Sequence, residues 1–305
     1  MSVVDLVAHG ALAVASRLRP RNPGGVIINW HTLTARQTQF QVDVLSRWFD
    51  FIHHDELLAR LVRPGSRPFC LLTFDDGKRS GVTEAAPELE RLGVPAIFYV
   101  VTRFLTDGAP LWFDRQDEIV RTLGYTPSEL DLEELTRLPL AAVTERLDRA
   151  YDRHKVSPDT PSDHVRAMSW DDARDLTRRG FTIGAHGLRH STLTCETEAD
   201  ALADIEQSIS EVSAQLGTCT TFAFPNGSYT PQLGRHALRS GAKTAMTTDP
   251  LWADSRFPLW RLPRVQLFGH QSRAKIELKL AVAATRLLAG LDETRKVYRR
   301  IRTPS

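Results

Sequence analysis

The chain has 305 residues, of which 42% are hydrophobic and 25% charged, a globular composition that excludes disordered, collagenous and coiled-coil proteins. Its 39 basic and 37 acidic residues give a net charge of +2, which argues against a dedicated nucleic-acid binder. The three cysteines are far apart and form no Cys-x-x-Cys pair, so neither a disulfide framework nor a thiolate zinc site is expected.

The first residues predict a surface helix within 1–23. Residues 3–15 are apolar, but Asp5 and His9 interrupt them and no basic residue precedes them, whereas a secretory signal begins with positive charge. No stretch of the sequence has the roughly 18 apolar residues that a membrane-spanning helix needs. We therefore expect a cytoplasmic protein.

Short apolar strands alternate with helical patterns along the next part of the chain, 24–270. Helices are expected at 39–49, 196–216 and in the stretch that ends at Leu92, and Gly93 and Gly217 suit the positions just after a helix. The expected strands are 25–30, 69–74, 96–101, 181–185, 221–225 and 243–248. Strands that alternate with helices at this spacing pair in parallel and form an α/β layer or barrel.

Two segments depart from this alternation. Residues 107–165 are polar and carry helical patterns at 116–123, 128–138 and 141–154 without a strand between them, so we expect a helical insertion that covers one rim. Residues 271–305 have nine Lys/Arg and three Asp/Glu, a net charge of +6, and a helical pattern. Such a basic helix can lie on anionic lipid, and a solvated face is the alternative.

Two adjacent carboxylates follow the apolar run 69–74. Asp75, Asp76 and Gly77 stand where a buried strand ends, and catalytic groups of α/β proteins collect at that end. Neighbouring side chains of an extended chain point to opposite sides, so one carboxylate can bind a metal while the other serves as a base. An Asp-Gly turn or a helix N-cap is the structural alternative.

Two histidines follow the expected strand 181–185. His186 and His190 are four residues apart, so a helical turn or a compact loop can direct both imidazoles to one point. Two neutral imidazoles and a carboxylate suit a divalent metal and leave positions for water and substrate. Together with the Asp-Asp pair they predict a metal site.

The sequence TFDDG at 73–77, followed by His-x-x-x-His at 186–190, resembles the motifs of the polysaccharide deacetylase superfamily (NodB homology, carbohydrate esterase family 4). The resemblance covers residues 24–270 and implies a deformed (β/α)7-type barrel, here with the helical insertion and the basic C-terminal helix added. It also implies a hydrolase of carbon–nitrogen bonds that removes an N-acyl group, commonly acetyl, from an amino sugar.

The resemblance assigns roles to four residues of this chain. It implies that Asp75 is the general base and that Asp76, His186 and His190 bind the metal. Amide hydrolysis needs an activated water and stabilisation of the oxyanion, and a metal supplies both. Zinc is the default metal for these ligands, and cobalt or nickel would also fit.

The sequence departs from the family pattern at several positions. Gly187 follows the first histidine where the family often has Ser or Thr, and Ala223 stands where the family has an arginine that orients the base. Arg264 is the candidate replacement for that arginine, with a surface arginine as the alternative. Asn226 falls where the family uses a backbone N–H to hold the oxyanion, and Tyr229 could line the sugar pocket.

The histidine expected to protonate the leaving amine has two candidates. The family's late Leu-x-His is missing from its expected place, where His270 is the only histidine. His31 ends the expected strand 25–30, as in the circularly permuted members whose acid histidine precedes TFDDG. The first and last strands of a closed barrel are neighbours, so either residue could reach the site. We favour His31.

The leading hypothesis is a metal-dependent N-deacylase of polysaccharide or glycolipid biosynthesis that acts on an N-acylated amino sugar. A cytoplasmic enzyme would meet nucleotide-linked or lipid-linked sugars, and the basic C-terminal helix would suit peripheral association with the inner membrane. One alternative is deformylation or another amide hydrolysis at the same centre. The other is a non-catalytic carbohydrate-binding protein on a degenerate deacetylase fold, against which the four retained motif residues argue.

Overall fold

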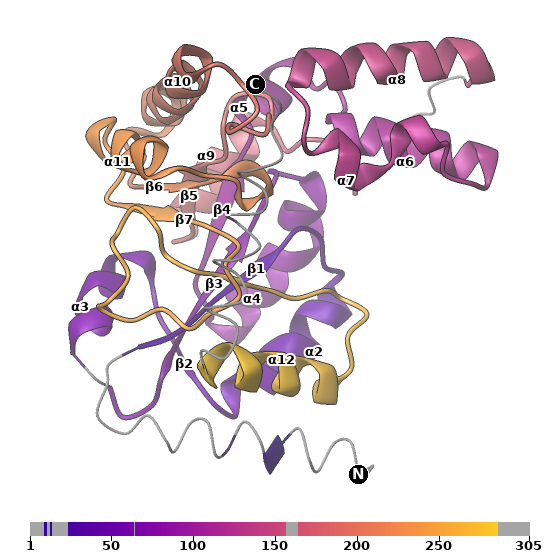
Figure 1. Cartoon of the computed structure of the whole chain (residues 1–305). Coiled ribbons are helices and arrows are strands. Elements are labelled where there is room, and N and C mark those ends of the chain that lie inside the picture. The colour runs from indigo at the N-terminus through magenta and orange to yellow at the C-terminus, as the bar shows by residue number, and fades with distance from the viewer. Residues whose placement is uncertain (1–8, 11–12, 14–23, 64, 157–163, 286–305) are drawn as a thin grey trace.

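A single parallel sheet forms the centre of the fold, as the computed structural model shows for the residues that it describes, 9–10, 13, 24–63, 65–156 and 164–285 (Figure 1). The strands are β1 (Gly25–Trp30), β2 (Asp50–Phe51), β3 (Phe69–Phe74), β4 (Ala96–Val100), β5 (Thr182–Ala185), β6 (Thr221–Ala223), β7 (Thr244–Met246) and β8 (Val265–Gln266). They follow the order β7-β6-β5-β4-β3-β1-β8, with β2 on β3, and all pair in parallel. The curled sheet of seven consecutive strands confirms the expected deformed (β/α)7-type barrel.

The apolar strands are buried on both faces because the sheet curls around its own core. Ile27 and Leu71 point into the curl, where Tyr99 and Leu262 also lie. The residues that alternate with them along the strands, such as Val26, point outward into the larger core under the helices. Alternate residues of a strand face opposite sides, so a run without polar interruption is what a strand covered on both sides requires.

Helices cover the outer face of the sheet. They are α2 (Ala35–Ser46), α4 (Ala86–Leu92), α5 (Thr102–Asp107), α9 (Trp170–Arg178), α10 (Glu198–Leu216), α11 (Pro231–Arg239) and α12 (Arg273–Thr285), whereas α3 (Leu57–Val62) packs Leu57 and Leu61 into the core inside the curl. Gly93 and Gly217 end α4 and α10 in the left-handed conformation, as their positions in the sequence predicted. α2 begins four residues earlier than expected because Thr34 and Gln37 form a capping box.

The helical insertion projects from one end of the barrel and comprises α6 (Trp112–Leu123), α7 (Leu132–Leu135) and α8 (Leu140–His154) (Figure 1). Its helices enclose a small core of their own, which includes Ile119, Leu130 and Leu147. The prediction of a single helix at 128–138 is wrong. A 3₁₀ turn (Ser128–Leu130) and α7 replace it, because the Asp131 side chain accepts from Glu134 N and starts a new helix.

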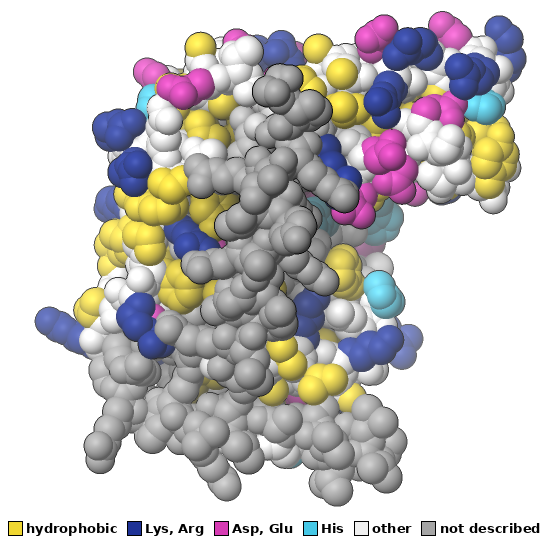
Figure 2. Space-filling model, in the orientation of Figure 1, with side chains coloured by type: hydrophobic (Ala, Val, Ile, Leu, Met, Phe, Trp, Pro, Cys, Tyr) yellow, Lys and Arg dark blue, Asp and Glu magenta, His cyan; other side chains and the backbone are white. Residues whose placement is uncertain are grey.

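The outer surface of the insertion carries basic and acidic side chains next to one another (Figure 2). Several form ion pairs on exposed helix faces, among them Arg121–Asp117 and Arg137–Glu133. Mixed charge of this kind is typical of a solvated surface and contributes little to stability.

The expected terminal helices fall largely outside the described residues. This holds for the surface helix at 1–23, of which three residues are described, and for the basic stretch at 286–302. α12 lies beside α2, and the Trp48 indole donates a hydrogen bond to Glu277 Oε1 at 3.1 Å. Among the helices described, none combines the length and the apolar character needed to cross a bilayer.

Candidate active site

The ends of β1, β3 and β5, with β4 between the last two, bring the predicted residues to one edge of the sheet. β1 and β3 are in register up to Trp30 and Phe74, and Asp75 N extends the ladder by donating to Trp30 O at 2.8 Å. His31 and Asp75 therefore leave the sheet side by side. His186 follows β5, and its backbone N–H donates to Val100 O at the end of β4 at 2.9 Å. Catalytic groups of parallel barrels collect at this end of the strands.

The two adjacent carboxylates diverge because the chain turns at Asp76, not because it is extended, as the sequence analysis assumed. Asp76 has φ of 75°, in the left-handed region, and Gly77 follows with φ of 76°. Gly77 packs so closely on α5 and the end of β4 that a Cβ there would lie 2.9 Å from Leu105 Cδ1 and 3.2 Å from Val100 Cγ1. The turn sends one carboxylate toward the histidines and the other toward Arg264.

Asp76, His186 and His190 form a compact cluster of buried side chains whose potential ligand atoms all lie within 4.8 Å of one another. Asp76 Oδ1 is 3.7 Å from His186 Nε2 and 3.4 Å from His190 Nε2. Ligands bound to zinc at about 2.0–2.2 Å in tetrahedral geometry lie about 3.3–3.6 Å apart. The three side chains thus have the spacing of a divalent metal site.

Hydrogen bonding and burial favour the ligand forms of both imidazoles. His186 Nδ1 lies 2.8 Å from Ala223 O, so Nδ1 carries the proton and Nε2 presents its lone pair toward Asp76. Burial lowers the pKa of His190 to about 3, despite the opposing effect of the Asp76 charge, so this imidazole is neutral at ordinary pH.

The Asp76 carboxylate is the clearest sign that a cation belongs here. It is 1% exposed, and neither of its oxygens accepts a hydrogen bond from the described residues. Burial raises its pKa, but the charges of His31, His190 and Lys78 hold the pKa below its ordinary value. A buried carboxylate without donors is costly unless it is paired or coordinates a metal, so these residues fit the metal that the motif implies.

Asp75 is instead held by a fully buried arginine, Arg264, which directly precedes β8 in the chain. Arg264 Nη1 and Nη2 donate to Asp75 Oδ1 and Oδ2 at 2.7 and 2.8 Å, a bidentate pair. Arg264 Nε donates to Thr247 O at 3.0 Å, which fixes the plane of the guanidinium. Burial raises the pKa of Asp75, but the charge and hydrogen bonds of Arg264, together with the charges of His186 and His31, outweigh burial and the pKa is about 2. Arg264 thus occupies the place predicted for it beside Asp75.

Asn226 and Tyr229 lie in the loop after β6. Asn226 has φ of 55°, and its Nδ2 donates to Thr192 Oγ1 at 2.8 Å, which ties this loop to the one that carries His190. The Tyr229 hydroxyl donates to Asp249 Oδ2 at 3.0 Å. The roles predicted for these two residues, oxyanion binding and sugar binding, remain predictions.

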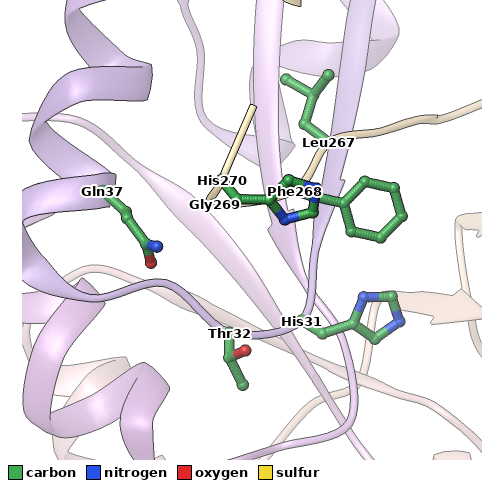
Figure 3. Close-up of a pocket in the computed structure, with 7 residues that line it drawn as sticks. All are labelled: His31, Thr32, Gln37, Leu267, Phe268, Gly269 and His270. Carbon is green, nitrogen blue, oxygen red and sulfur yellow. The ribbon is translucent and has the colours of Figure 1, made fainter. Parts of the chain in front are cut away.

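His31 and His270 line the same pocket, of about 250 Å³ (Figure 3). His31 is half-buried, and the register of Trp30 with Phe74 places it beside Asp75, where its charge lowers the pKa of both Asp75 and Asp76. His270 is exposed on the segment after β8. β8 pairs with β1, so the last strand does return to the first, as the sequence analysis expected of a barrel.

The insertion contributes contacts that the sequence analysis did not find. The Trp112 indole donates to His190 O at 3.1 Å, and the ring centroids of Phe113 and His190 are 5.0 Å apart. Asp114 pairs with the buried Lys78, and burial raises the pKa of Asp114 to about 6 against the effect of Lys78. These residues form the first turn of α6 and follow no motif, so only the tertiary structure reveals them.

The structure also explains why a glycine stands at position 187. Its φ is 75°, and a Cβ would lie 2.8 Å from Asp204 Oδ1, which accepts the Leu188 N–H at 3.0 Å. The α10 carboxylate therefore stabilises the turn between the two histidines and leaves no room for the Ser or Thr that the family often has there.

Comparisons with known proteins agree with this site. The family described as polysaccharide deacetylase matches residues 63–245, more than half of the chain. The chain belongs to the polysaccharide deacetylase family. This membership confirms the predicted family and the enzyme class, a hydrolase of carbon–nitrogen amide bonds that acts on polysaccharide. Among curated proteins, no relative matches the sequence.

Solved structures of deacetylases share the fold at low sequence identity. The deacetylase PplD of Streptococcus pyogenes, in complex with acetate, aligns with a TM-score of 0.62 and 14% identity over 85% of this chain and 99% of its own. IcaB of Ammonifex degensii gives 0.57 and 18% over 87% and 98%. The BpsB deacetylase domain of Bordetella bronchiseptica gives 0.53 and 18% over 80% and 96%. These similarities support the fold of this polysaccharide deacetylase.

Proposed function

We propose that the protein is a metal-dependent N-deacylase that removes an acyl group, in first place acetyl, from an amino sugar of a polysaccharide or glycolipid. The observation that carries the proposal is the contrast between two adjacent buried carboxylates. Asp75 has a bidentate arginine, whereas Asp76 has no hydrogen-bond donor and faces two imidazoles. One carboxylate is thus prepared to accept a proton and the other to bind a cation.

Asp76, His186 and His190 would hold the metal, with zinc the first candidate and cobalt or nickel compatible with the same ligands. When bound, a metal would polarise the acyl carbonyl as a Lewis acid and lower the pKa of a water molecule. A base with a low pKa can accept a proton from that water only because the pKa of the water is lowered.

Asp75 is proposed as the general base. Its two hydrogen bonds to Arg264 fix the carboxylate plane, so the base does not have to be oriented during the reaction. With a pKa of about 2 it is ionised throughout the neutral range. Arg264 is therefore a positioning residue, because it acts through Asp75.

His31 is proposed as the general acid that protonates the leaving amine. An amide anion is a very poor leaving group, so the sugar nitrogen must receive a proton as the bond breaks. His31 is half-buried, opens into the pocket and lies within electrostatic range of Asp75. Histidine is the side chain that most often serves as a general acid in enzymes.

The setting of the reaction is a further part of the proposal. The net charge of +6 over residues 271–305 supports a peripheral contact with anionic lipid, where lipid-linked or polymeric sugars would be presented. Association of the full chain with vesicles containing phosphatidylserine or cardiolipin, and its loss at high salt, would test this part.

The decisive experiment measures acid release. The purified protein is loaded with zinc and given N-acetylglucosamine oligomers or their N-formyl analogues, and acetate and formate are quantified with and without a chelator. We expect acetate release that the chelator abolishes and added zinc restores. His31→Ala should lower the rate more than His270→Ala, and the reverse order would transfer the acid role. Formate release alone would identify a deformylase, and hydrolysis that is insensitive to chelation would contradict the proposal.

A further inference from the structure

A row of polar side chains crosses the inside of the curled sheet, among the apolar residues that fill it. The strand register places Tyr99 of β4 opposite Gly184 of β5, and Thr221 of β6 opposite Thr244 of β7. The pairing of β5 with β6 sets Gly184 at the level of Thr221 as well. These residues thus form one level of the barrel across four neighbouring strands (Figure 1). The mechanism proposed above uses none of them.

Hydrogen bonds make the row continuous. The Tyr99 hydroxyl is 2.7 Å from Thr221 Oγ1, and the Thr244 hydroxyl donates to the same oxygen at 2.9 Å. His54 Nε2 lies 2.9 Å from Thr244 Oγ1. Because the Thr244 hydroxyl gives its hydrogen to Thr221, His54 Nε2 must carry the proton of the bond between them. Burial lowers the pKa of His54 to about 4, so the imidazole is neutral at ordinary pH.

Tyr99 reaches Thr221 because the residue between them is a glycine. A Cβ at Gly184 would lie 2.5 Å from Tyr99 Cε1 and 2.8 Å from Thr221 Cγ2, so the phenol ring lies directly on the backbone of β5. The Tyr99 side chain is fully buried, and burial raises the pKa of its hydroxyl, which stays protonated. A buried hydroxyl without a partner is destabilising, so the hydrogen bond and the packing together fix the ring in one position.

The fixed ring contacts the residue that holds the proposed base and one of the proposed metal ligands. The Arg264 guanidinium carbon is 5.4 Å from the centroid of the Tyr99 ring, within the range of a cation–π interaction. The centroid of the His186 ring is 6.4 Å from it, with the rings tilted by 44°. Asp75, one residue beyond the end of β3, stands next to Tyr99 in the register of β3 and β4.

The buried guanidinium needs such a contact. Arg264 donates from Nε to Thr247 O and from Nη1 to Thr73 Oγ1, in addition to its two bonds to Asp75. The N–H groups of a guanidinium lie in one plane and bind acceptors in that plane, so movement out of it must be restrained by packing. An aromatic ring provides this packing without competing for the N–H groups.

We propose that Tyr99 is a positioning residue of the reaction. Its ring holds the pair of Arg264 and Asp75 in place, and the row of hydrogen bonds that ends at His54 holds the ring. The inference rests on the proposed function and extends it, because the orientation of the base then depends on contacts with the first residues of β6 and β7, away from the strand ends that carry the site.

The main test compares two neighbouring residues of β4. Tyr99→Leu removes the ring in question, whereas Phe98→Leu removes an equally buried ring that belongs to the outer core. Acetate release by the zinc-loaded proteins gives kcat per bound zinc and KM. We expect kcat of Tyr99→Leu to fall about tenfold, the scale of a buried cation–π contact, with KM nearly unchanged. Phe98→Leu should keep the kcat of the wild type, although denaturant unfolding shows a similar loss of stability.

A second readout does not depend on activity. In protein made with isotope-labelled arginine, the Nε–H signal of Arg264 is identified by its absence from Arg264→Leu, and its exchange with solvent is followed by NMR. The bond to Thr247 O should protect this proton in the wild type. Tyr99→Leu should accelerate its exchange about tenfold, and Phe98→Leu should not.

Two milder variants test the row itself. Tyr99→Phe and Thr221→Val each remove one side of the same hydrogen bond and nearly keep the shape of the side chain. Each should lower kcat by about two- to fivefold, and the combined loss should be clearly smaller than the product of the two, because they share that bond. The inference is overturned if the losses multiply, or if Tyr99→Leu matches Phe98→Leu in kcat or in the exchange of Arg264.

Failure of the inference and failure of the proposed function give different results. Acetate release by the wild type that Tyr99→Leu fully retains contradicts the inference and leaves the proposed function standing. Exchange of Arg264 that depends on Tyr99, without acetate release by the wild type, contradicts the proposed function but retains Tyr99 as the residue that holds Arg264.

Discussion

The barrel rim and the helical insertion both contact the buried cluster of acids and histidines, but they supply different things. The rim supplies every group proposed to react or to bind a metal, and each one stands within a few residues of a parallel strand. The insertion supplies one turn, residues 112–114 of α6, which contacts the backbone and ring of His190 and the Lys78 ammonium from the side.

This difference indicates that the rim and the insertion have separate roles. Strand ends in a curled sheet are fixed by ladders on both sides, so they can hold reacting atoms to a fraction of an ångström. The insertion has its own small core and surface ion pairs, and it can change its outer surface without moving the rim. If this comparison is correct, substitutions at the rim should abolish function and substitutions in the insertion should only reduce it.

The largest effect is expected from His186→Ala. This change removes a ligand atom that nothing nearby can replace, so the protein should lose both bound zinc and deacylation. Metal content after dialysis and the absorption of a cobalt-substituted sample measure the first, and acetate release the second. His236→Ala, on α11 and away from the cluster, should retain both. A His186 variant with full zinc content would contradict the metal site.

Asp75→Asn should separate chemistry from metal binding. The amide keeps the shape of the side chain but cannot accept a proton, so turnover should fall by about 10²- to 10⁴-fold while zinc remains bound. The measurement is kcat per bound zinc. Asp76→Asn is the paired variant and should lose the metal instead, so identical behaviour of the two variants would show that the carboxylates do not have separate roles.

Arg264→Leu should alter the pH dependence of the enzyme. In the wild type the pKa of Asp75 is about 2, below the ordinary value of 3.8, so the stability that the pair confers is complete above about pH 4 and is lost as the pH falls toward 2. Without the guanidinium, burial remains and the pKa of Asp75 rises above its ordinary value. The acidic limb of kcat/KM should therefore move to higher pH.

The same variant should be less stable by about 3–5 kcal/mol near neutral pH, because it leaves a buried carboxylate unpaired, and part of the loss should be recovered on acidification. Denaturant unfolding at several pH values measures this. Arg121→Leu is the control, since Arg121 pairs with Asp117 on the surface of α6 and both side chains are more than half exposed. An unchanged acidic limb in Arg264→Leu would contradict the positioning role.

The smallest effect is expected from Asp114→Asn in the insertion. It removes the charge opposite Lys78 without touching a ligand, so the dissociation constant for zinc should rise by less than about tenfold, the lower end of what outer contacts of metal sites contribute. Asp117→Asn, on the exposed face of the same helix, should have no effect. A loss as large as that in His186→Ala would mean that the insertion belongs to the metal centre itself.

The sequence predicted those parts of the molecule whose signals are local. Apolar runs marked the strands that frame the site, and Asp75, Asp76, His186 and His190 directly follow such runs, so their convergence could be expected from parallel pairing. Arg264 could be named only as a candidate, because its partner is 189 residues away. The two-residue strands β2 and β8 are too short to produce a pattern.

Other features depend on tertiary contacts that no pattern encodes. The contacts of Trp112 and Asp114 exist because the insertion folds back onto the rim, and the sequence analysis could place the insertion only as a cover. Helix α9 was not expected, although Ser169 and Asp172 form a capping box that is visible in the sequence. The sequence analysis considered a turn at Asp-Asp-Gly only as the alternative to a catalytic pair on an extended chain, whereas the structure has the left-handed turn at Asp76 and the two separated carboxylates together.

That turn belongs to a wider pattern. Among the described residues, four that are not glycine have positive φ, and three of them, Asp76, His190 and Asn226, lie around the site. Each such residue costs roughly 1–2 kcal/mol relative to a glycine or a right-handed conformation. A ligand that binds only the folded state offsets such a cost by mass action. If the proposed metal binds here, the metal-free form should unfold more readily and be degraded faster by proteases, so the metal would affect the lifetime of the protein as well as its proposed activity.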